Sequence, residues 1–441
     1  MTINEMIHDL TWTSLPETVK KKVRRCLLDT IATALCGRKT EVSKIIYEFA
    51  ARTYGGSGAR LWLDGRSVSP PGAALAHGMT IDSFDMHDSC RPVKGHAGVA
   101  LVPTVLATLS LDKAGKISGQ ELLTSLVAGY EVAIRAGKAL HATASDYHTS
   151  GAWSALGCAA VTARRLGLIA EETRHALGIA EYHGPRSQMM RCIDHPTMVK
   201  DGSGWGAMCG VSAALMASAG FTGAPALTVE DQEVAETWDD MGTEWMILIQ
   251  YFKPYAVCYW TQAAIAGALN LQKEHHIKPE DIKHVQIFTF HEAYRLACRR
   301  PQATDEAQYS LPFPVAMALV RGRLGLDELT GEALHDPTVL RLIDRIEVLD
   351  DDTFNARFPA ERLSRVVIDT VDGESYDSGK VQPLWDLSAP PTDNELREKF
   401  RWLATYSLSE KQAETLEEAV WHCDELDDTS VLEELLSYIR S

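Results

Sequence analysis

The stretch from Asp85 to Gly98 concentrates side chains that can carry acid/base chemistry. It holds two carboxylates, two imidazoles, a hydroxyl and two cations, namely Asp85, Asp88, His87, His96, Ser89, Arg91 and Lys94. An apolar helical sequence follows directly, and charged groups that face a core must be paired or functional. Histidine moves protons near neutral pH and cations hold carboxylates, so this stretch is a candidate catalytic segment.

Three further segments set a basic or polar residue against small, apolar sequence. They contain His148, Lys200 and Lys253, in Tyr147–Trp153, Val199–Gly204 and Phe252–Tyr255. Each has a simple structural explanation, because a lone His before a helix often caps it and a lone Lys beside Gly is usually solvated. Basic or polar residues recur in this way at the edges of four helices, and this recurrence favours a site that they share.

The run from Asp82 to Asp88 also permits a metal site. Three carboxylates and a His within seven residues could bind a divalent cation. The alternative is a polar loop whose carboxylates bond to backbone or pair with Arg91 and Lys94. We expect no metal, since no other segment offers a comparable density of ligands. Phosphate-loop, dinucleotide-loop and HExxH signatures are absent from the sequence.

The composition describes an acidic globular chain of 441 residues with a formal charge of −17. An acidic balance argues against nucleic-acid binding, whose footprint is basic. An anionic substrate would therefore need a local cluster of cations. The nine cysteines are scattered and form no CxxC pair, which indicates reduced cysteines in a cytoplasmic protein. We expect neither a leader peptide nor a membrane span, because the most apolar stretch, 206–227, is typical of a buried helix.

Helical signals dominate the first 270 residues. The pattern Ser14-Leu15-Pro16-Glu17 predicts a capping box before a helix that Gly37 ends, and Ser118 to Glu121 repeats the pattern. The stretches 150–166, 206–220 and 258–272 are rich in Ala, Gly and Ser, which predicts helices in the centre of a large bundle.

A smaller α+β domain is predicted over 271–393. Residues 283–290 and 345–349 alternate with period two, and 365–378 reads as a hairpin around Asp372-Gly373. A helix over 312–321 lies between these strands, and the chain is helical again from 394. We therefore expect a mainly α protein, in which 1–270 and 394–441 form an all-helical domain and 271–393 an inserted α+β lid.

The ordered motifs along the chain resemble those of the MmgE/PrpD family, which includes 2-methylcitrate dehydratase, cis-aconitate decarboxylase and iminodisuccinate epimerase. The resemblance covers nearly the whole chain. It is carried by Asp85-x-x-Asp88-Ser89 with Gly95-His96, by His148 before Leu156-Gly157-Cys158, by Lys200 before Gly210-Val211-Ser212, by Gly220-Phe221-Thr222-Gly223, by Lys253-Pro254-Tyr255 and by Ala307–Pro312.

The resemblance implies a helical domain, an α+β lid, a site in the cleft between them and usually a homodimer. Family site positions carry over to Asp85, Ser89, His96, His148, Lys200 and Lys253. The final family position is normally Tyr but is Phe313 here, which removes a phenolic proton donor. The sequence around Asp85 to His96 looks closer to the epimerase, although the acidic residue expected at His87 is missing.

These features predict a cofactor-independent enzyme that moves a proton next to a carboxylate of a small di- or tricarboxylate. His96 and His148 are expected to carry the proton, and Asp85 to orient a His. Lys200 and Lys253 are expected to bind carboxylates, with Ser89, Arg91, Lys94 and Phe313 completing the substrate site. The outcome could be that of a lyase or an epimerase; a non-catalytic homologue and a metal-dependent hydrolase are the alternatives.

Overall fold

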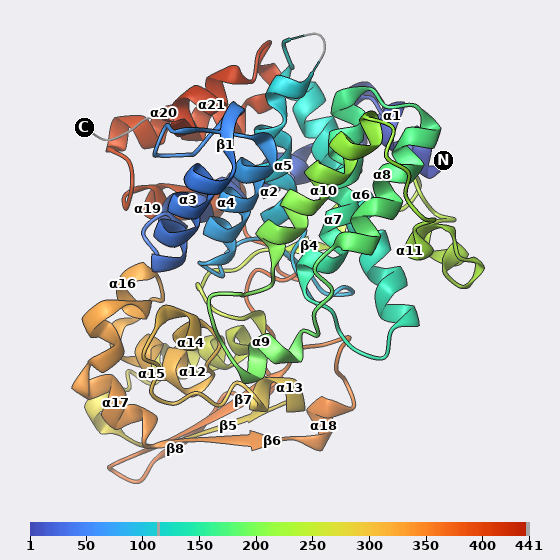
Figure 1. The fold of residues 1–441 in the computed structure, drawn as a ribbon. Coiled ribbons are helices and arrows are strands. Elements are labelled where there is room, and N and C mark those ends of the chain that lie inside the picture. Colours follow the sequence, from blue (N-terminus) through green and yellow to red (C-terminus); the bar gives the residue numbers. More distant parts are fainter. Residues whose placement is uncertain (113–114, 438–441) are drawn as a thin grey trace.

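The computed structural model describes residues 1–112 and 115–437, and it shows two bodies (Figure 1). The larger body is helical and contains the N-terminal part of the chain. Its helices are α1 (Ile3–His8), α2 (Glu17–Gly37), α3 (Glu41–Thr53), α4 (Pro70–Asp82), α5 (Gly98–Ala107), α6 (Gly119–Thr143), α7 (Ser150–Leu166), α8 (Ala170–His183), α10 (Ser203–Ser218) and α11 (Leu227–Glu230). Two small strand pairs accompany them, β1 (Gly55–Arg60) with β2 (Ser67–Val68) and β3 (Ser89–Cys90) with β4 (Gln250–Tyr251).

The smaller body is built on a four-stranded sheet of order β6-β5-β7-β8. Its strands are β5 (Ile282–Thr289), β6 (Ile346–Asp350), β7 (Ser364–Thr370) and β8 (Ser375–Asp377). β5 pairs parallel with β6 and antiparallel with β7, and β7 pairs antiparallel with β8. The helices of this body are α12 (Gln262–Glu274), α13 (His291–Tyr294), α14 (Thr304–Gln308), α15 (Pro312–Arg321), α16 (Leu326–Leu329), α17 (Pro337–Ile343) and α18 (Asp352–Asn355).

The C-terminal helices return to the larger body, as Figure 1 shows in red. They are α19 (Asp393–Ala404), α20 (Glu410–Trp421) and α21 (Ser430–Ser437), and α19 and α20 pack on α2. The last four residues of the expected C-terminal stretch, 438–441, lie outside the described part. The mainly helical fold with a smaller mixed domain is thereby confirmed.

The border between the bodies lies before α12, whereas the sequence placed it at residue 271. The Ala-rich sequence of α12 predicts a place in the helical bundle, but this helix packs against β7 and α15. At Gly267 a Cβ atom would lie 3.1 Å from the side chain of Val366, so the small residue lets the helix approach the sheet closely. A run of small residues therefore indicates close packing without specifying the partner.

Helix ends follow the predicted capping at one place and depart from it at another. Ser118 accepts from the Glu121 N–H, as expected. Ser14 instead lies in a 3-10 turn, where its hydroxyl bonds to the Thr11 carbonyl, and the extended Pro16 precedes α2. The capping box at Ser14 is therefore wrong. Among the described residues no helix combines the length and apolarity needed to cross a bilayer.

Candidate active site

A hairpin-like loop between α4 and α5 carries the catalytic segment. Its strand β3 pairs with β4, with Ser89 opposite Tyr251 and Cys90 opposite Gln250. The Ser89 hydroxyl donates to the Gly95 carbonyl at 3.1 Å and so closes the loop. Because β4 leads directly to Lys253, the strand pairing brings this lysine beside Asp85.

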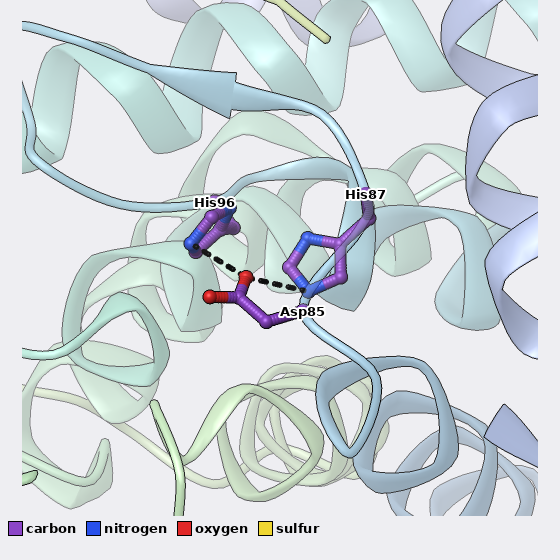
Figure 2. Close-up of side chains that lie close together, drawn as sticks. All are labelled: Asp85, His87 and His96. Atoms are coloured by element: carbon purple, nitrogen blue, oxygen red, sulfur yellow. Dashed lines mark ion pairs between the residues drawn. The ribbon is translucent and has the colours of Figure 1, made fainter. Parts of the chain in front are cut away.

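The centre of the site is the Asp85 carboxylate (Figure 2). One of its oxygens accepts from the Lys253 ammonium, and the same oxygen lies 3.7 Å from His96 Nε2 and 3.9 Å from His87 Nε2. All four side chains are buried. Burial alone would raise the pKa of Asp85, but the adjacent Lys253 ammonium outweighs it and holds that pKa below its ordinary value. Asp85 is therefore an anion at neutral pH.

His96 has the arrangement of a general base. Its Nδ1 lies 2.9 Å from the Asp88 carbonyl, which can only accept, so Nδ1 carries the proton and Nε2 carries the lone pair. Burial, followed by the charge of Lys253, lowers the pKa of His96. The imidazole is thus neutral at pH 7 and its Nε2 faces Asp85, which would stabilise the imidazolium once a proton arrives.

His87 stands against His96, with the two ring centroids 4.4 Å apart and nearly perpendicular. It is fully buried, and its Nε2 has no hydrogen-bond partner among the described residues. Burial is the first cause that lowers the pKa of His87 and keeps it neutral. After His96 Nε2, His87 Nε2 is thus a second ring nitrogen that faces Asp85, and it can offer either a lone pair or an N–H.

Asp85, His87 and His96 also form a group of three potential metal ligands, whose donor atoms lie within 4.8 Å of one another. The expectation that no such density exists rested on counting separate segments, whereas these ligands all come from one loop. The Lys253 ammonium already occupies the Asp85 oxygen that both imidazoles face. A cation placed there would be repelled by this ammonium, so the donor set fits a proton-transfer site better than a metal site.

Lys200 reaches the same site from the segment before α10. Its ammonium donates to Gln308 Oε1 at 2.9 Å, and the same amide oxygen accepts from the Asp85 N–H at 2.9 Å. The Tyr309 ring lies 4.6 Å from the ammonium. Lys200 has a left-handed backbone with φ 47°, a conformation that a non-glycine residue adopts only where its surroundings fix it. One bridging amide thus couples Lys200 to Asp85.

A cavity of about 410 Å³ opens beside Lys200. Its walls include Cys192, Gly202 and Trp205, and Lys200 is the residue shared by the cavity and the Asp85 cluster. Lys200 is only 2% exposed although it carries a charge. A small molecule in the cavity would therefore lie beside a lysine whose charge is buried.

The remaining expected site residues lie around this centre. His148 precedes α7, is partly buried, and bonds through Nδ1 to the Asp146 carbonyl at 3.0 Å; no contact joins it to Asp85 in the described structure. Its backbone pairs with Gln188, which lines the cavity. Lys94 lies over the Tyr147 ring at 3.8 Å, and burial lowers its pKa to about 8.

The contacts of Arg91 and Phe313 are of the kind that hold the fold together. Arg91 pairs with the buried Asp386 and donates to the Ala360 carbonyl at 2.7 Å, which ties the loop to the segment before α19. Phe313 is fully buried in the first turn of α15, where its N–H bonds to Ser310. Tyr309, four residues earlier, supplies the phenol that lies against Lys200.

A buried ion pair behind the site was not predicted. The Lys399 ammonium, from α19, bonds to Asp29 on α2 at 2.6 Å, to the Met86 carbonyl at 2.5 Å and to the Lys253 carbonyl at 3.0 Å. Asp88 accepts from the Tyr130 hydroxyl at 2.7 Å. Burial, the largest cause, raises the pKa of Asp88 to about 7. These groups fix both backbone segments that carry Asp85 and Lys253.

Sequence reasoning missed Gln308 as a site residue, and it offered Tyr309 only as the residue that reaches the cleft if Phe313 belongs to the core. Both belong to the motif Ala307–Pro312 that carries the family resemblance, so the signal was present. Their role depends on contacts to residues more than a hundred positions away, which local sequence does not specify.

A neutral imidazole, an anchored carboxylate and a buried ammonium thus lie together, with a cavity beside the ammonium-bearing Lys200. The chain belongs to the MmgE/PrpD family: the model of the MmgE/PrpD N-terminal domain matches residues 1–238 and that of the C-terminal domain residues 255–425. This membership confirms the family predicted from the motifs.

Curated relatives match along nearly their whole length. The chain is 23% identical to the cis-aconitate decarboxylase-like protein oryM of Aspergillus oryzae, over 98% of this chain and 95% of that protein. It is 23% identical to the human cis-aconitate decarboxylase (98% and 92%) and 25% identical to that of Aspergillus terreus (97% and 94%). The family and these relatives support an enzyme of the lyase type.

Proposed function

We propose that this protein is a cofactor-independent lyase that acts on a small di- or tricarboxylate. It would make or discharge negative charge on a carbon next to a carboxylate. The relatives named above are cis-aconitate decarboxylases or decarboxylase-like, which supports a lyase outcome. The chemistry of the site supports the same class independently.

The observation that carries the proposal is the state of Lys200. Its ammonium is almost completely buried, and in the described part of the chain no carboxylate lies within ion-pair distance of it. The direct contacts of this ammonium are a neutral amide and an aromatic ring, and the buried carboxylates of Asp82 and Asp85 act on it only from beyond ion-pair distance. A buried charge without a direct ion-pair partner is unfavourable by several kcal/mol. Such a charge is explained by a ligand that supplies the missing anion, and a carboxylate has the right charge and shape.

The neighbouring groups give each step a proton carrier. In a decarboxylation the bond between the carbon and the leaving carboxylate breaks, CO₂ departs, and the electron pair stays on the carbon until a proton is delivered. Lys200 would stabilise the negative charge that spreads onto the retained carboxylate. His96 would take or return the proton at Nε2, and Asp85 would stabilise the imidazolium.

Tyr309 is the second proton carrier of the proposal. Its phenol is buried, and burial together with the charges of Asp201 and Asp85 raises its pKa well above the ordinary value. A phenol that stays protonated can donate to a carbanion, which is the role the family position at Phe313 no longer supplies. Lys253, expected to bind substrate, would act on it through Asp85, whose charge it neutralises.

Epimerisation is the second candidate outcome. It requires one group to remove the proton and another to return it on the opposite face. His96 and Tyr309 are two such groups near Asp85, and His87 adds an imidazole that the family resemblance does not predict. The stereochemistry of the recovered substrate distinguishes this outcome from elimination.

The test is a panel of di- and tricarboxylates, including cis-aconitate and 2-methylcitrate, followed by proton NMR in heavy water with and without a chelator. We expect solvent exchange or CO₂ or water loss for one class member, insensitive to the chelator. His96→Asn should abolish it, whereas His284→Asn, on the sheet of the smaller body, should not. Exchange-free spectra for the whole panel would refute the function, and loss of turnover with chelator would favour the metal-dependent alternative.

The homodimer remains a proposal as well. It comes from the family resemblance, and sedimentation or light scattering of the full chain measures it directly. A monomer that retains turnover would contradict it without affecting the chemistry.

A further inference from the structure

The segment between α8 and α10 leaves the helical body and lies against the smaller one. Its helix α9 (Met190–Asp194) is drawn beside α13 and α14 in Figure 1, and Asp194 pairs with Arg295 just after α13. The cavity beside Lys200 is lined largely by this segment, which contributes Arg191 and His195 to its wall. Arg191 and His195 therefore share the cavity wall with Lys200.

The cavity wall has a charge opposite to that of the protein. The cations Arg191 and Lys200 line it together with His195, and none of its lining residues is Asp or Glu. The whole chain carries a formal charge of −17. A pocket with one sign of charge on a protein of the other sign concentrates ligands of the matching charge. The lining therefore suits an anionic ligand.

Arg191 is free to bind such an anion. Its guanidinium contacts the Ser187 hydroxyl at 3.3 Å, and no carboxylate of the described residues lies within ion-pair distance of it. The acidic neighbour on the same helix, Asp194, is already taken by Arg295 through two hydrogen bonds. The five N–H groups of a guanidinium match a carboxylate in a two-point contact.

We propose that this cavity is a second carboxylate subsite, in which Arg191, assisted by His195, holds the carboxylate farther from the reacting carbon. Lys200 holds the nearer one, since it is shared with the Asp85 cluster. Trp205 and Val199 in the same wall contact the carbon chain between them. The inference rests on the proposed function and deepens it by naming the residue that binds the second carboxylate of the di- or tricarboxylate. Arg191 becomes a specificity-determining residue.

The experiment measures binding of tricarballylate, which has three carboxylates and no leaving group, and of propionate, which has one, by calorimetry and NMR titration. Arg191→Gln should weaken tricarballylate about 10- to 100-fold, the loss of one charged hydrogen-bonded contact, and leave propionate unchanged. Lys200→Met should weaken both ligands. The matched control is Arg52→Gln, an exposed arginine on α3 away from the cavity, which should change neither.

The outcomes separate this inference from the function beneath it. If propionate binding needs Lys200 but Arg191→Gln binds tricarballylate as the wild type does, the subsite is wrong and the proposed function stands. If the wild type binds neither ligand, both are refuted. A KM that rises for a dicarboxylate substrate in Arg191→Gln while kcat stays within about threefold would support the subsite in turnover as well.

Discussion

Replacing Lys200 and Lys253 by methionine should change the stability of the free protein in opposite directions. Both lysines are buried and both lie at the site. If burial alone decided the effect, both replacements would change the free energy of unfolding in the same direction. The difference is that Lys253 pairs with Asp85, whereas Lys200 contacts an amide oxygen and an aromatic ring.

For Lys253 the expected change is a loss. Methionine would leave the Asp85 carboxylate buried, with only the neutral imidazoles of His87 and His96 facing it. Removing one partner of a buried ion pair costs about 3–5 kcal/mol. The double variant Lys253→Met with Asp85→Asn removes both charges and should recover about 2–3 kcal/mol of that loss.

For Lys200 the expected change is a gain of about 1 kcal/mol. The relief of a buried charge without a direct ion-pair partner exceeds the lost hydrogen bond to Gln308, the lost contact with Tyr309 and the lost longer-range attraction to the Asp82 and Asp85 carboxylates. Gln308 Oε1 is not orphaned, because it still accepts from the Asp85 N–H. The methionine side chain has a similar length and fills the same space.

Urea unfolding at pH 7, with the free energy of unfolding taken at constant m, measures both effects. Ligand binding by both single variants is measured in parallel, since Lys200→Met should gain stability and lose carboxylate affinity together. The reasoning is refuted if Lys200→Met destabilises the protein as much as Lys253→Met does.

Two further predictions concern proton carriers, and a third concerns the pH dependence of stability. His96→Asn should lower kcat about 10²–10⁴-fold. Because the pKa of His96 is lowered, wild-type kcat/KM should stay constant from neutral pH to below pH 6.5. A decrease of kcat/KM that begins above pH 7 on acidification would exclude His96 as the base. Tyr309→Phe should lower kcat at least about tenfold, whereas Phe313→Tyr should change kcat less than about threefold. If steady-state rates show the reverse order, the residue at position 313 and not Tyr309 is the proton donor. Burial lowers the pKa of His77 to about 3, and its Nε2 accepts from the Trp62 N–H, so the unfolded chain binds a proton that the folded one does not. Stability should therefore be complete above about pH 6.5 and fall as the pH drops toward 3, by about 2 kcal/mol at pH 5, and urea titrations of His77→Asn should show a shallower slope than the wild type.

The strands of the smaller body were predictable because their burial is local and periodic. Residues 283–290 alternate in polarity, and β5 spans Ile282–Thr289 with alternating burial. The hairpin around Gly373 follows from turn chemistry in the same way. The border at α12 was not predictable, since small residues permit packing against a sheet or a helix equally well.

The candidate site was predictable as residues but not as contacts. Local chemistry selects the Asp85 loop, Lys200 and Lys253, because charge in an apolar context is visible in a short window. The pairing of Asp85 with Lys253 joins residues 168 positions apart, and the Gln308 bridge joins Lys200 to a residue 108 positions away. Contacts between residues so far apart in the sequence are set by the packing of the two bodies. Patterns in a single sequence do not reveal that packing.

The position of Lys399 has a consequence for when the enzyme becomes complete during synthesis. Its ammonium holds the backbone at Met86 and at Lys253 and neutralises Asp29, three points that are translated long before α19. Until α19 has docked on α2, Asp29 is an unpaired carboxylate inside a helical body, and two carbonyls of the catalytic segments lack their donor. A nascent chain can therefore fold most of both bodies while its catalytic loop still lacks a fixed conformation. The catalytic loop becomes ordered only when the last tenth of the chain, which contains Lys399 of α19, has been translated.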